Sequence, residues 1–282
     1  MSHATSYAVV GFGCNDDGQL GTGAKRRKAL AIDDVSSSNF PKQLESLLEE
    51  VIAVSCGSRH TMALTANGAV YSWGWGSMGQ LGHGDLKCIN VPKKIVFFEE
   101  DKLIVNYISS GGCHSAAVTK DGTLYMWGET HWGQLGLPME FQASHESLPV
   151  KCSLPIDDSQ EHIVKVSCGG THTAALTNLG RVFAWGRGDS GQLGIGSAWL
   201  KDTNDESLMG VSSPHLLHGF DGDKVVQVAC GAFHSAAVTE KGHVYSWGKE
   251  DYGMLGVGQT SDQQIPKRID FFDDIPALCV VL

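Results

Sequence analysis

The feature that most constrains this chain is a phrase that occurs five times along it. Each copy has an aromatic residue and glycine, four variable residues, and then Gly-Gln-Leu-Gly, with Met in place of Gln in the last copy. The closing glycines are Gly21, Gly82, Gly136, Gly194 and Gly256. They are 54 to 62 residues apart, and a period of this kind predicts a repeat architecture in which each copy is one structural unit.

A second phrase precedes four of the five copies. It reads Cys-Gly or Ser-Gly, then two residues and histidine, and each histidine lies thirteen residues before the aromatic residue of its unit. The histidines are His60, His114, His172 and His234, and the aromatic residues are Trp73, Trp127, Trp185 and Trp247. Two phrases at a constant offset in four copies indicate true repeats.

The residues between the two phrases predict short β-strands. Val51–Cys56, His60–Thr65 and Ala69–Trp73 are apolar-rich runs, and Asn67-Gly68 lies between the last two. A two-residue turn that ends in glycine between such runs is a hairpin signal. Three or four strands in each unit are typical of a β-propeller blade or a β-solenoid unit, so we predict an all-β fold.

Composition agrees with many tight turns and argues against several classes of protein. Glycine accounts for 35 of the 282 residues and proline for only 8, which argues against disorder and collagen. The net charge of -10 makes nucleic acid and chromatin unexpected partners. No secretion signal or long apolar run is visible, and the eight cysteines form no C-x-x-C pair. We therefore expect free thiols, no membrane association, and a cytoplasmic or nuclear location.

The combination of the two phrases resembles the regulator of chromosome condensation repeat family. Tyr71-Ser72-Trp73-Gly74 and the run from Gly79 to Asp85 follow its pattern closely, and the resemblance covers nearly the whole chain. The resemblance implies a β-propeller, usually of seven blades. Members of the family act in nucleotide exchange on a small GTPase, in UV-B perception in plants, as accessory domains of ubiquitin ligases and as scaffolds. The resemblance therefore implies a fold more firmly than a function.

The chain encodes about five blades, which is fewer than that ring has. We expect a single propeller domain, 1–282, with a partial unit at 1–40, repeats at 41–91, 92–148, 149–213 and 214–265, and a partial unit at 266–282. Three interpretations stay open. The chain is a truncated seven-blade ring, or a smaller ring in which its C-terminal strand joins the N-terminal strands in one blade, or a protein that dimerises to protect its open ends.

The repeated residues themselves are expected to be structural. The four repeat histidines lie in separate blades and should not converge on one metal ion, so we predict that each bonds backbone within its own blade. Cysteine and serine share the slot occupied by Cys56 and Ser110, which suits a small packing residue rather than a nucleophile. The four repeat tryptophans are expected to fill the spaces between blades. With no catalytic motif in the sequence, we predict no catalytic, metal or cofactor site.

The signature of the plant UV-B photoreceptor branch is absent from these repeats. That branch has Gly-Trp-Arg-His in consecutive blades, and only Arg59 keeps the arginine here. The places of its tryptophans are taken by Ser58, Gly112, Gly170 and Ala232. The sequence therefore gives little support to photoreception by that mechanism.

Residues outside the repeat pattern are the candidates for partner contacts. Exposed aromatic residues often anchor interfaces, and three tryptophans lie beside the repeat positions or in a long connection: Trp75, Trp132 and Trp199. Two long connections, Thr22–Phe40 and Ile195–Ser213, supply charged candidates. These are Lys25, Arg26, Arg27 and Lys28 in the first, and Asp202, Asp205 and Glu206 in the second.

We accordingly predict a non-enzymatic scaffold that binds a protein partner through loops on a propeller face. The alternative is a guanine nucleotide exchange factor for a small GTPase, which needs no catalytic side chain of its own. A UV-B light sensor is the second alternative.

Overall fold

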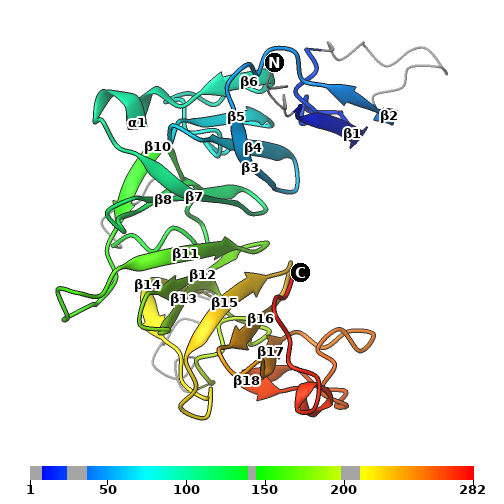
Figure 1. Ribbon diagram of the computed structural model, residues 1–282, viewed down its shortest axis with the longest axis vertical. Coiled ribbons are helices and arrows are strands. Elements are labelled where there is room, and N and C mark those ends of the chain that lie inside the picture. Colours follow the sequence, from blue (N-terminus) through cyan, green and yellow to red (C-terminus); the bar gives the residue numbers. More distant parts are fainter. Residues whose placement is uncertain (1–7, 24–36, 139–143, 198–209) are drawn as a thin grey trace, which may run out of the picture.

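The computed structural model describes residues 8–23, 37–138, 144–197 and 210–282. Its regular secondary structure is almost entirely β-strand, with one short helix, α1 (Val96–Glu100), and a 3-10 turn at Asp270–Phe272. Its described residues form four sheets of four antiparallel strands and one sheet of two strands. The four-stranded sheets follow one another along an arc in the order of the sequence (Figure 1). This arrangement confirms the predicted all-β propeller of about five blades.

Each four-stranded sheet is a meander of consecutive strands. The first contains β3 (Val51–Cys56), β4 (His60–Thr65), β5 (Val70–Gly74) and β6 (Ile89–Lys94), and the second β7 (Val105–Ser110), β8 (His114–Thr119), β9 (Leu124–Glu129) and β10 (His145–Cys152). The third contains β11 (Ile163–Cys168), β12 (His172–Thr177), β13 (Val182–Arg187) and β14 (Gly210–Leu216). The fourth contains β15 (Val225–Cys230), β16 (His234–Thr239), β17 (Val244–Gly248) and β18 (Gln263–Arg268).

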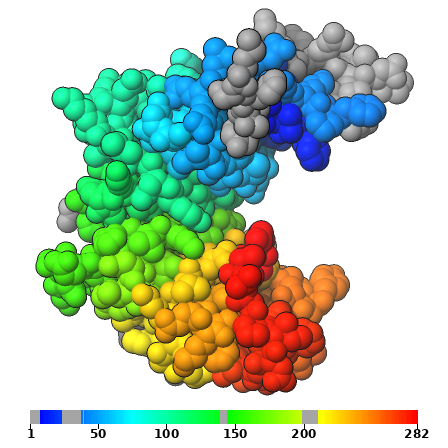
Figure 2. Space-filling view, viewed as in Figure 1, coloured from blue at the N-terminus to red at the C-terminus, as the bar shows by residue number. Residues whose placement is uncertain are grey.

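The arc does not close. Among the described residues, β1 (Val10–Cys14) at one end pairs only with β2 (Ser37–Gln43), and Figure 2 shows an open side between this end and the last sheet. In the described residues the C-terminal strand does not join the N-terminal strands, so the interpretation as a smaller closed ring is wrong. Instead, residues 277–282 lie along the fourth sheet, where Ala277 N–H donates to Gly242 O at 3.0 Å and Val280 bonds the side chain of Gln227.

The strands follow the repeat closely. β4 and β5 pair in register from His60 opposite Gly74 to Leu64 opposite Val70, and the same pairing recurs from His172 opposite Gly186. The hairpin glycine between these strands has φ of +84° at Gly68, a conformation that glycine adopts without steric cost. Its equivalents Gly122, Gly180 and Gly242 have φ of +82°, +81° and +81°. The predicted hairpins are thus confirmed.

The apolar core lies between consecutive sheets. Trp127 of the second sheet packs with Met62, Leu64 and Val70 of the first in one cluster of buried residues. Trp185 and Trp247 pack in the same way against the second and third sheets. In the first four phrases the closing glycine makes room for the tryptophan of the next sheet; a Cβ at Gly82, for example, would lie 2.9 Å from Trp127 Nε1.

A polar network joins the sheets beside each tryptophan. Gln80 O accepts from Trp127 Nε1 at 2.9 Å and from Ser115 Oγ at 2.9 Å. His60 Nε2 lies 2.8 Å from the same hydroxyl. Because Ser115 gives its proton to Gln80, it must accept from His60, which places the proton of the neutral imidazole on Nε2.

This network corrects the prediction for the histidines. Each of the first three bonds a hydroxyl of the next sheet rather than backbone of its own: His60 to Ser115, His114 to Thr173 at 2.9 Å, and His172 to Ser235 at 2.9 Å. The residue after each histidine supplies the hydroxyl for the preceding sheet. The histidines thus connect the sheets to one another.

None of the helices among the described residues has the length and apolarity that a membrane crossing needs.

Candidate interaction surface

The antiparallel strands give the propeller two faces. The loop face carries the segments before each repeat histidine (57–59, 111–113, 169–171 and 231–233) and the loops that follow each Trp-Gly. The turn face carries the hairpin turns (66–69, 120–123, 178–181 and 240–243) and the connections between sheets. The repeat fixes the backbone before each repeat histidine and at each hairpin turn, whereas the side chains at these places vary from copy to copy.

On the loop face each sheet brings together two variable residues. The residue after Trp-Gly donates its N–H to the carbonyl of the residue before the histidine, as in Trp75 to Arg59 and Arg187 to Thr171, both at 2.9 Å. The same bond joins Glu129 to Cys113 and Lys249 to Phe233, both at 2.9 Å. These pairs place cationic, aromatic and acidic side chains at equivalent points around the arc.

One cluster lies at the first sheet. The Arg59 guanidinium sits 4.5 Å from the centre of the Trp75 ring, a cation–π geometry. It also donates to Asp17 through Nε at 2.7 Å and Nη2 at 2.9 Å. These hydrogen bonds raise the pKa of Arg59 above its usual value. Asp17 comes from the loop after β1, so this cluster joins two repeats.

A second cluster connects three sheets. The Arg187 guanidinium lies 4.6 Å from the ring centre of Trp132 in the preceding sheet and 5.7 Å from that of Phe233 in the following one. It donates to Asp189 through Nε at 2.9 Å and Nη2 at 2.7 Å. Burial favours the neutral form of Asp189, but the hydrogen bonds from Arg187 and Gln192 outweigh it and lower the pKa of Asp189. The carboxylate is therefore ionised at neutral pH.

The edge of the second cluster extends onto the fourth sheet. Lys249 Nζ lies 5.7 Å from the Phe233 ring and 2.6 Å from Asp251 Oδ2. On the other side His131 packs edge-on against Trp132, with 4.8 Å between the ring centres. Cations, aromatic rings and carboxylates thus alternate across the loop face from the second sheet to the fourth.

The structure places the predicted contact residues unevenly. Trp75 and Trp132 are half-buried on the loop face, each stacked against an arginine. The remaining candidates lie outside the described residues: Lys25, Arg26, Arg27, Lys28, Trp199, Asp202, Asp205 and Glu206. The four repeat tryptophans are buried between sheets, as are the first three repeat histidines, and His234 is half-buried.

Arg187, Phe233 and Lys249 were not among the sequence candidates. A signal for them exists, because they occupy the positions beside the repeat histidine and the Trp-Gly where the copies differ most. Trp75, which occupies the same repeat position as Arg187 and Lys249, is a sequence candidate, but which of the other variable residues come together depends on how the sheets pack.

The chemistry of the loop face suits recognition. Arginine and tryptophan dominate the binding energy of many protein interfaces, and the ion pairs with Asp17 and Asp189 hold each guanidinium in place over its ring. Within the described ranges, no group of three or more His, Cys, Asp and Glu residues is placed to hold a metal ion.

Comparison with known proteins assigns the repeat to a family. The family model described as "RCC1-like domain" matches residues 5–280. The ultraviolet-B receptor UVR8 of Arabidopsis thaliana is 33% identical over 95% of the chain, and the E3 ubiquitin-protein ligase HERC2 of Homo sapiens is 34% identical over 93%. The secretion-regulating guanine nucleotide exchange factor of Bos taurus is 32% identical over 93% of the chain. The chain spans 56%, 5% and 55% of these relatives, respectively.

Solved structures agree with the fold. Human WBSCR16 matches with a TM-score of 0.73 and 29% identity over 90% of this chain and 60% of its own. Prp20p of Saccharomyces cerevisiae, described with its binding to Gsp1p and histones, matches with a TM-score of 0.69 and 29% identity over 84% of this chain and 54% of its own.

Proposed function

The chain belongs to the RCC1-like domain family, and on that premise we propose that it is a non-enzymatic scaffold that binds a protein partner through the loop face. Family membership alone does not choose this function, since the relatives include a light receptor, ubiquitin ligases and an exchange factor. The proposal rests on side chains that differ between the repeats and gather on one face.

The observation that carries the proposal is the cluster of Arg187, Trp132, Phe233 and Asp189. Arg187 keeps 27% of its side chain exposed while its charged end is held by Asp189 and stacked on two rings. A side chain fixed in this way loses little conformational freedom when a partner binds, which lowers the entropic cost of association. The repeat itself does not require these residues, because other copies have different ones at the same places.

Site-specific photocrosslinking tests the assignment. A photoreactive phenylalanine analogue replaces exposed His131 on the loop face, and in a matched protein it replaces exposed Lys120 on the turn face. The proteins are expressed in the source cells, and crosslinked partners are compared by mass spectrometry. We expect a defined partner from position 131, and its loss when Arg187→Glu is added.

The proposal fails if positions 120 and 131 capture the same proteins in equal amounts, or if Arg187→Glu leaves the capture unchanged. The conservative variant Arg187→Lys is the control for charge. It keeps the positive charge but lacks the planar fork that pairs with a carboxylate and stacks on rings, so we expect weaker capture than with the wild type.

Guanine nucleotide exchange on a small GTPase is the second candidate, supported by the exchange-factor relative that the chain matches over 93% of its length. Purified protein should then speed the release of labelled GDP from at least one member of a GTPase panel. Release at the intrinsic rate from every member would exclude this candidate.

UV-B sensing gains no support from the described residues, because the four positions of the missing tryptophans hold small side chains. A cytoplasmic or nuclear location and a dimer formed through the open ends are further proposals. Fractionation of cells and the mass of the purified protein in solution test them directly.

A further inference from the structure

The lysines and arginines of the loop face are all paired in the same way. Each one that the structure describes there has its own aspartate within ion-pair distance. The pairs are Arg59 with Asp17, Lys87 with Asp85, Arg187 with Asp189 and Lys249 with Asp251, with N–O distances of 2.7, 3.6, 2.7 and 2.6 Å. Such a pair carries no net charge, so the described part of the loop face presents no uncompensated cation.

Three carboxylates on the same face have no ion pair within the described ranges. Glu129 lies in the second sheet, at the end of β9, and Glu250 and Asp262 lie in the loop between β17 and β18 of the fourth. Asp262 Oδ1 accepts from the N–H of Glu250 at 2.8 Å, so these two residues are neighbours. The loop face therefore has two anionic points, one on each side of the third sheet.

Neutral groups hold the glutamates at both points. Gln134 Nε2 donates to Glu129 at 3.1 Å, and the N–H groups of Gly253 and Leu255 donate to Glu250 at 2.6 and 3.1 Å. Amide donors carry no net charge. They orient the carboxylates without neutralising them, so the negative charge is left for a partner.

The two anionic points flank the aromatic cluster of the proposed partner site. Gln134 joins the first point to that cluster, because its Oε1 accepts from the N–H of Trp132 at 2.8 Å while its Nε2 donates to Glu129. The second point follows Lys249 in the chain, and Lys249 Nζ lies 5.7 Å from the centre of the Phe233 ring. From the second sheet to the fourth, the loop face thus presents a carboxylate, the aromatic cluster and two further carboxylates.

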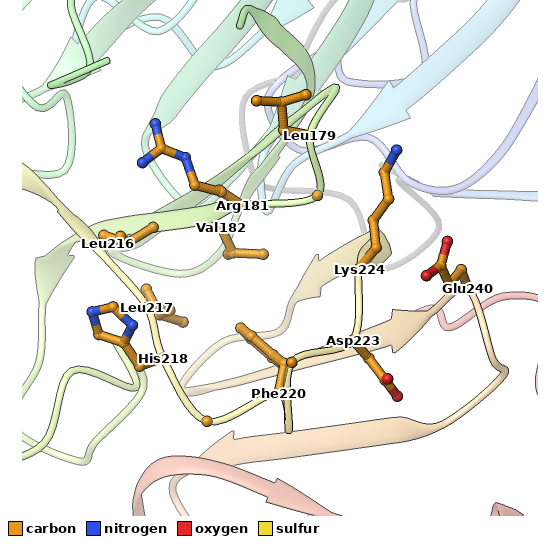
Figure 3. A pocket seen from close by; sticks show the side chains of 13 residues that line it. Leu179, Arg181, Val182, Leu216, Leu217, His218, Phe220, Asp223, Lys224 and Glu240 are labelled. Carbon is orange, nitrogen blue, oxygen red and sulfur yellow. The ribbon is translucent and has the colours of Figure 1, made fainter. Parts of the chain in front are cut away.

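The turn face differs because its uncompensated charges are of both signs. Lys120 and Lys224 are exposed there and have no ion pair within the described part of the chain. Around the pocket between the third and fourth sheets, Arg181 and Lys224 stand beside Asp223 and Glu240 (Figure 3). Uncompensated charge of a single sign therefore distinguishes the loop face.

We infer that the protein partner of the loop face is basic, and that it places lysine or arginine side chains at both anionic points. Complementary charge selects partners and steers their association. The rings of Trp132 and Phe233 also attract cations, as their contacts with Arg187 and Lys249 show. This inference rests on the proposed function, since it names the chemistry of the partner bound at the same face.

Titration with two capped peptides of opposite charge tests the inference. The probes are acetyl-Arg-Lys-Gly-Leu-Gly-Lys-Arg-amide and acetyl-Glu-Asp-Gly-Leu-Gly-Asp-Glu-amide, added to isotope-labelled full chain while backbone amide shifts are followed by NMR. We expect the basic peptide to shift the amides of Glu129, Gly188 and Glu250, and the acidic peptide to shift none of them. Shifts that the basic peptide scatters over both faces would overturn the inference, because they would show attraction to the net charge of the chain alone.

A triple variant of the loop face isolates the three charges: Glu129→Gln, Glu250→Gln and Asp262→Asn. These substitutions keep the hydrogen-bond acceptors and remove the charge. Exposed ion pairs contribute little individually, so we expect the triple variant to weaken the basic peptide about fivefold at low salt.

The matched control removes the same charge from exposed positions of the turn face, with Glu50→Gln, Glu99→Gln and Glu100→Gln. It should change the affinity by less than about twofold. Equal weakening by the two triple variants would overturn the inference.

Photocrosslinking from position 131 separates this inference from the proposed function. We expect the triple variant of the loop face to lose capture of the partner although Arg187 is intact. Undiminished capture by this variant would overturn the inference and leave the proposed function standing. Equal capture from positions 120 and 131 in the otherwise unchanged chain would overturn the proposed function, and the inference with it.

Discussion

The first strand of each four-stranded sheet is its inner strand and lies next to the first strands of the neighbouring sheets. The inner strands of the first and third sheets, β3 and β11, hold the same position in the repeat but differ in how far they are buried. Val54 in β3 and Val166 in β11 pair with alanines at the same register, Ala63 and Ala175. Val166 is 1% exposed and lies in a cluster with residues of the second sheet, whereas Val54 is 47% exposed. Within the part of the chain that the structure describes, β3 has a neighbouring inner strand only on the side of β7, and β11 has one on each side (Figure 1).

The same contrast separates the repeat histidines. His60, His114 and His172 are fully buried against a hydroxyl of the following sheet, and His234, in the last sheet, is half-buried. The repeat thus specifies the strand and its register, while burial is supplied by the neighbouring repeat. This is the behaviour of a repeat architecture in which stability resides in nearest-neighbour interfaces. The following predictions test that difference, from the largest expected effect to the smallest.

Acidification should act mainly on the interior histidines. Burial lowers the pKa of His60 to about 4 and those of His114 and His172 to about 3, while histidines of the unfolded chain titrate near 6.5. The stability that the neutral rings provide is complete above pH 6.5 and is lost as pH falls toward the folded pKa. At pH 4 each ring lowers the free energy of unfolding by roughly 3 kcal/mol relative to its value at pH 7. The three losses together rival the whole stability of a typical domain.

Urea unfolding at several pH values between 7 and 4.5 measures this effect. His114→Gln should lose stability less steeply than the wild type over that range. The stability of His234→Gln should follow that of the wild type more closely. Burial also lowers the pKa of His234, but this side chain is only half-buried, so its protonation should cost less stability. Parallel curves for His114→Gln and the wild type would contradict the assignment.

Removing an interior tryptophan should be the most damaging single substitution. Trp127 is 0% exposed and bonds Gln80 across the first interface. We expect Trp127→Ala to cost about 3–5 kcal/mol, measured by urea unfolding at pH 7. Trp75→Ala, at a half-buried position on the loop face, is the control and should cost less than about 1 kcal/mol.

Equal truncation of the two valines tests the comparison directly. We expect Val166→Ala to reduce the free energy of unfolding by about 1–3 kcal/mol, because it opens a cavity between two sheets. Val54→Ala should stay within about 0.5 kcal/mol. Equal losses would show that the open edge of β3 is covered in solution.

The smallest effect concerns the clusters on the loop face. Arg187→Lys should change stability by less than about 1 kcal/mol, since partly exposed ion pairs contribute little. It should nevertheless weaken partner capture at position 131. A large loss of stability would mean that the cluster holds three sheets together rather than presenting a surface.

Much of the fold follows from the repeat in the sequence. The strands from His60 and from Val70, and the hairpin at Gly68, lie where the apolar runs and the glycine predict them. The partner of His60 could not be predicted in this way. It is Ser115, 55 residues further on, and its identity depends on how two sheets pack rather than on the local sequence.

The candidate surface shows the same limit. Trp75 and Trp132 stand out in the sequence as aromatic residues outside the repeat slots. Arg187 gains its role only because folding brings it between Trp132 and Phe233, which lie in different sheets. Contacts within one sheet follow from spacing along the chain, whereas contacts between sheets require the packed structure.

The carbonyl of Gln80 shows that every interface in the arc has a direction. In each interface a main-chain carbonyl of one sheet accepts hydrogen bonds from an indole N–H and a hydroxyl of the next sheet. The carbonyl of Gln134 accepts from Trp185 and Thr173, and that of Gln192 accepts from Trp247 and Ser235. One copy of the repeat therefore carries both halves of the contact. Duplicating a single repeat would lengthen the arc without any new interface having to arise.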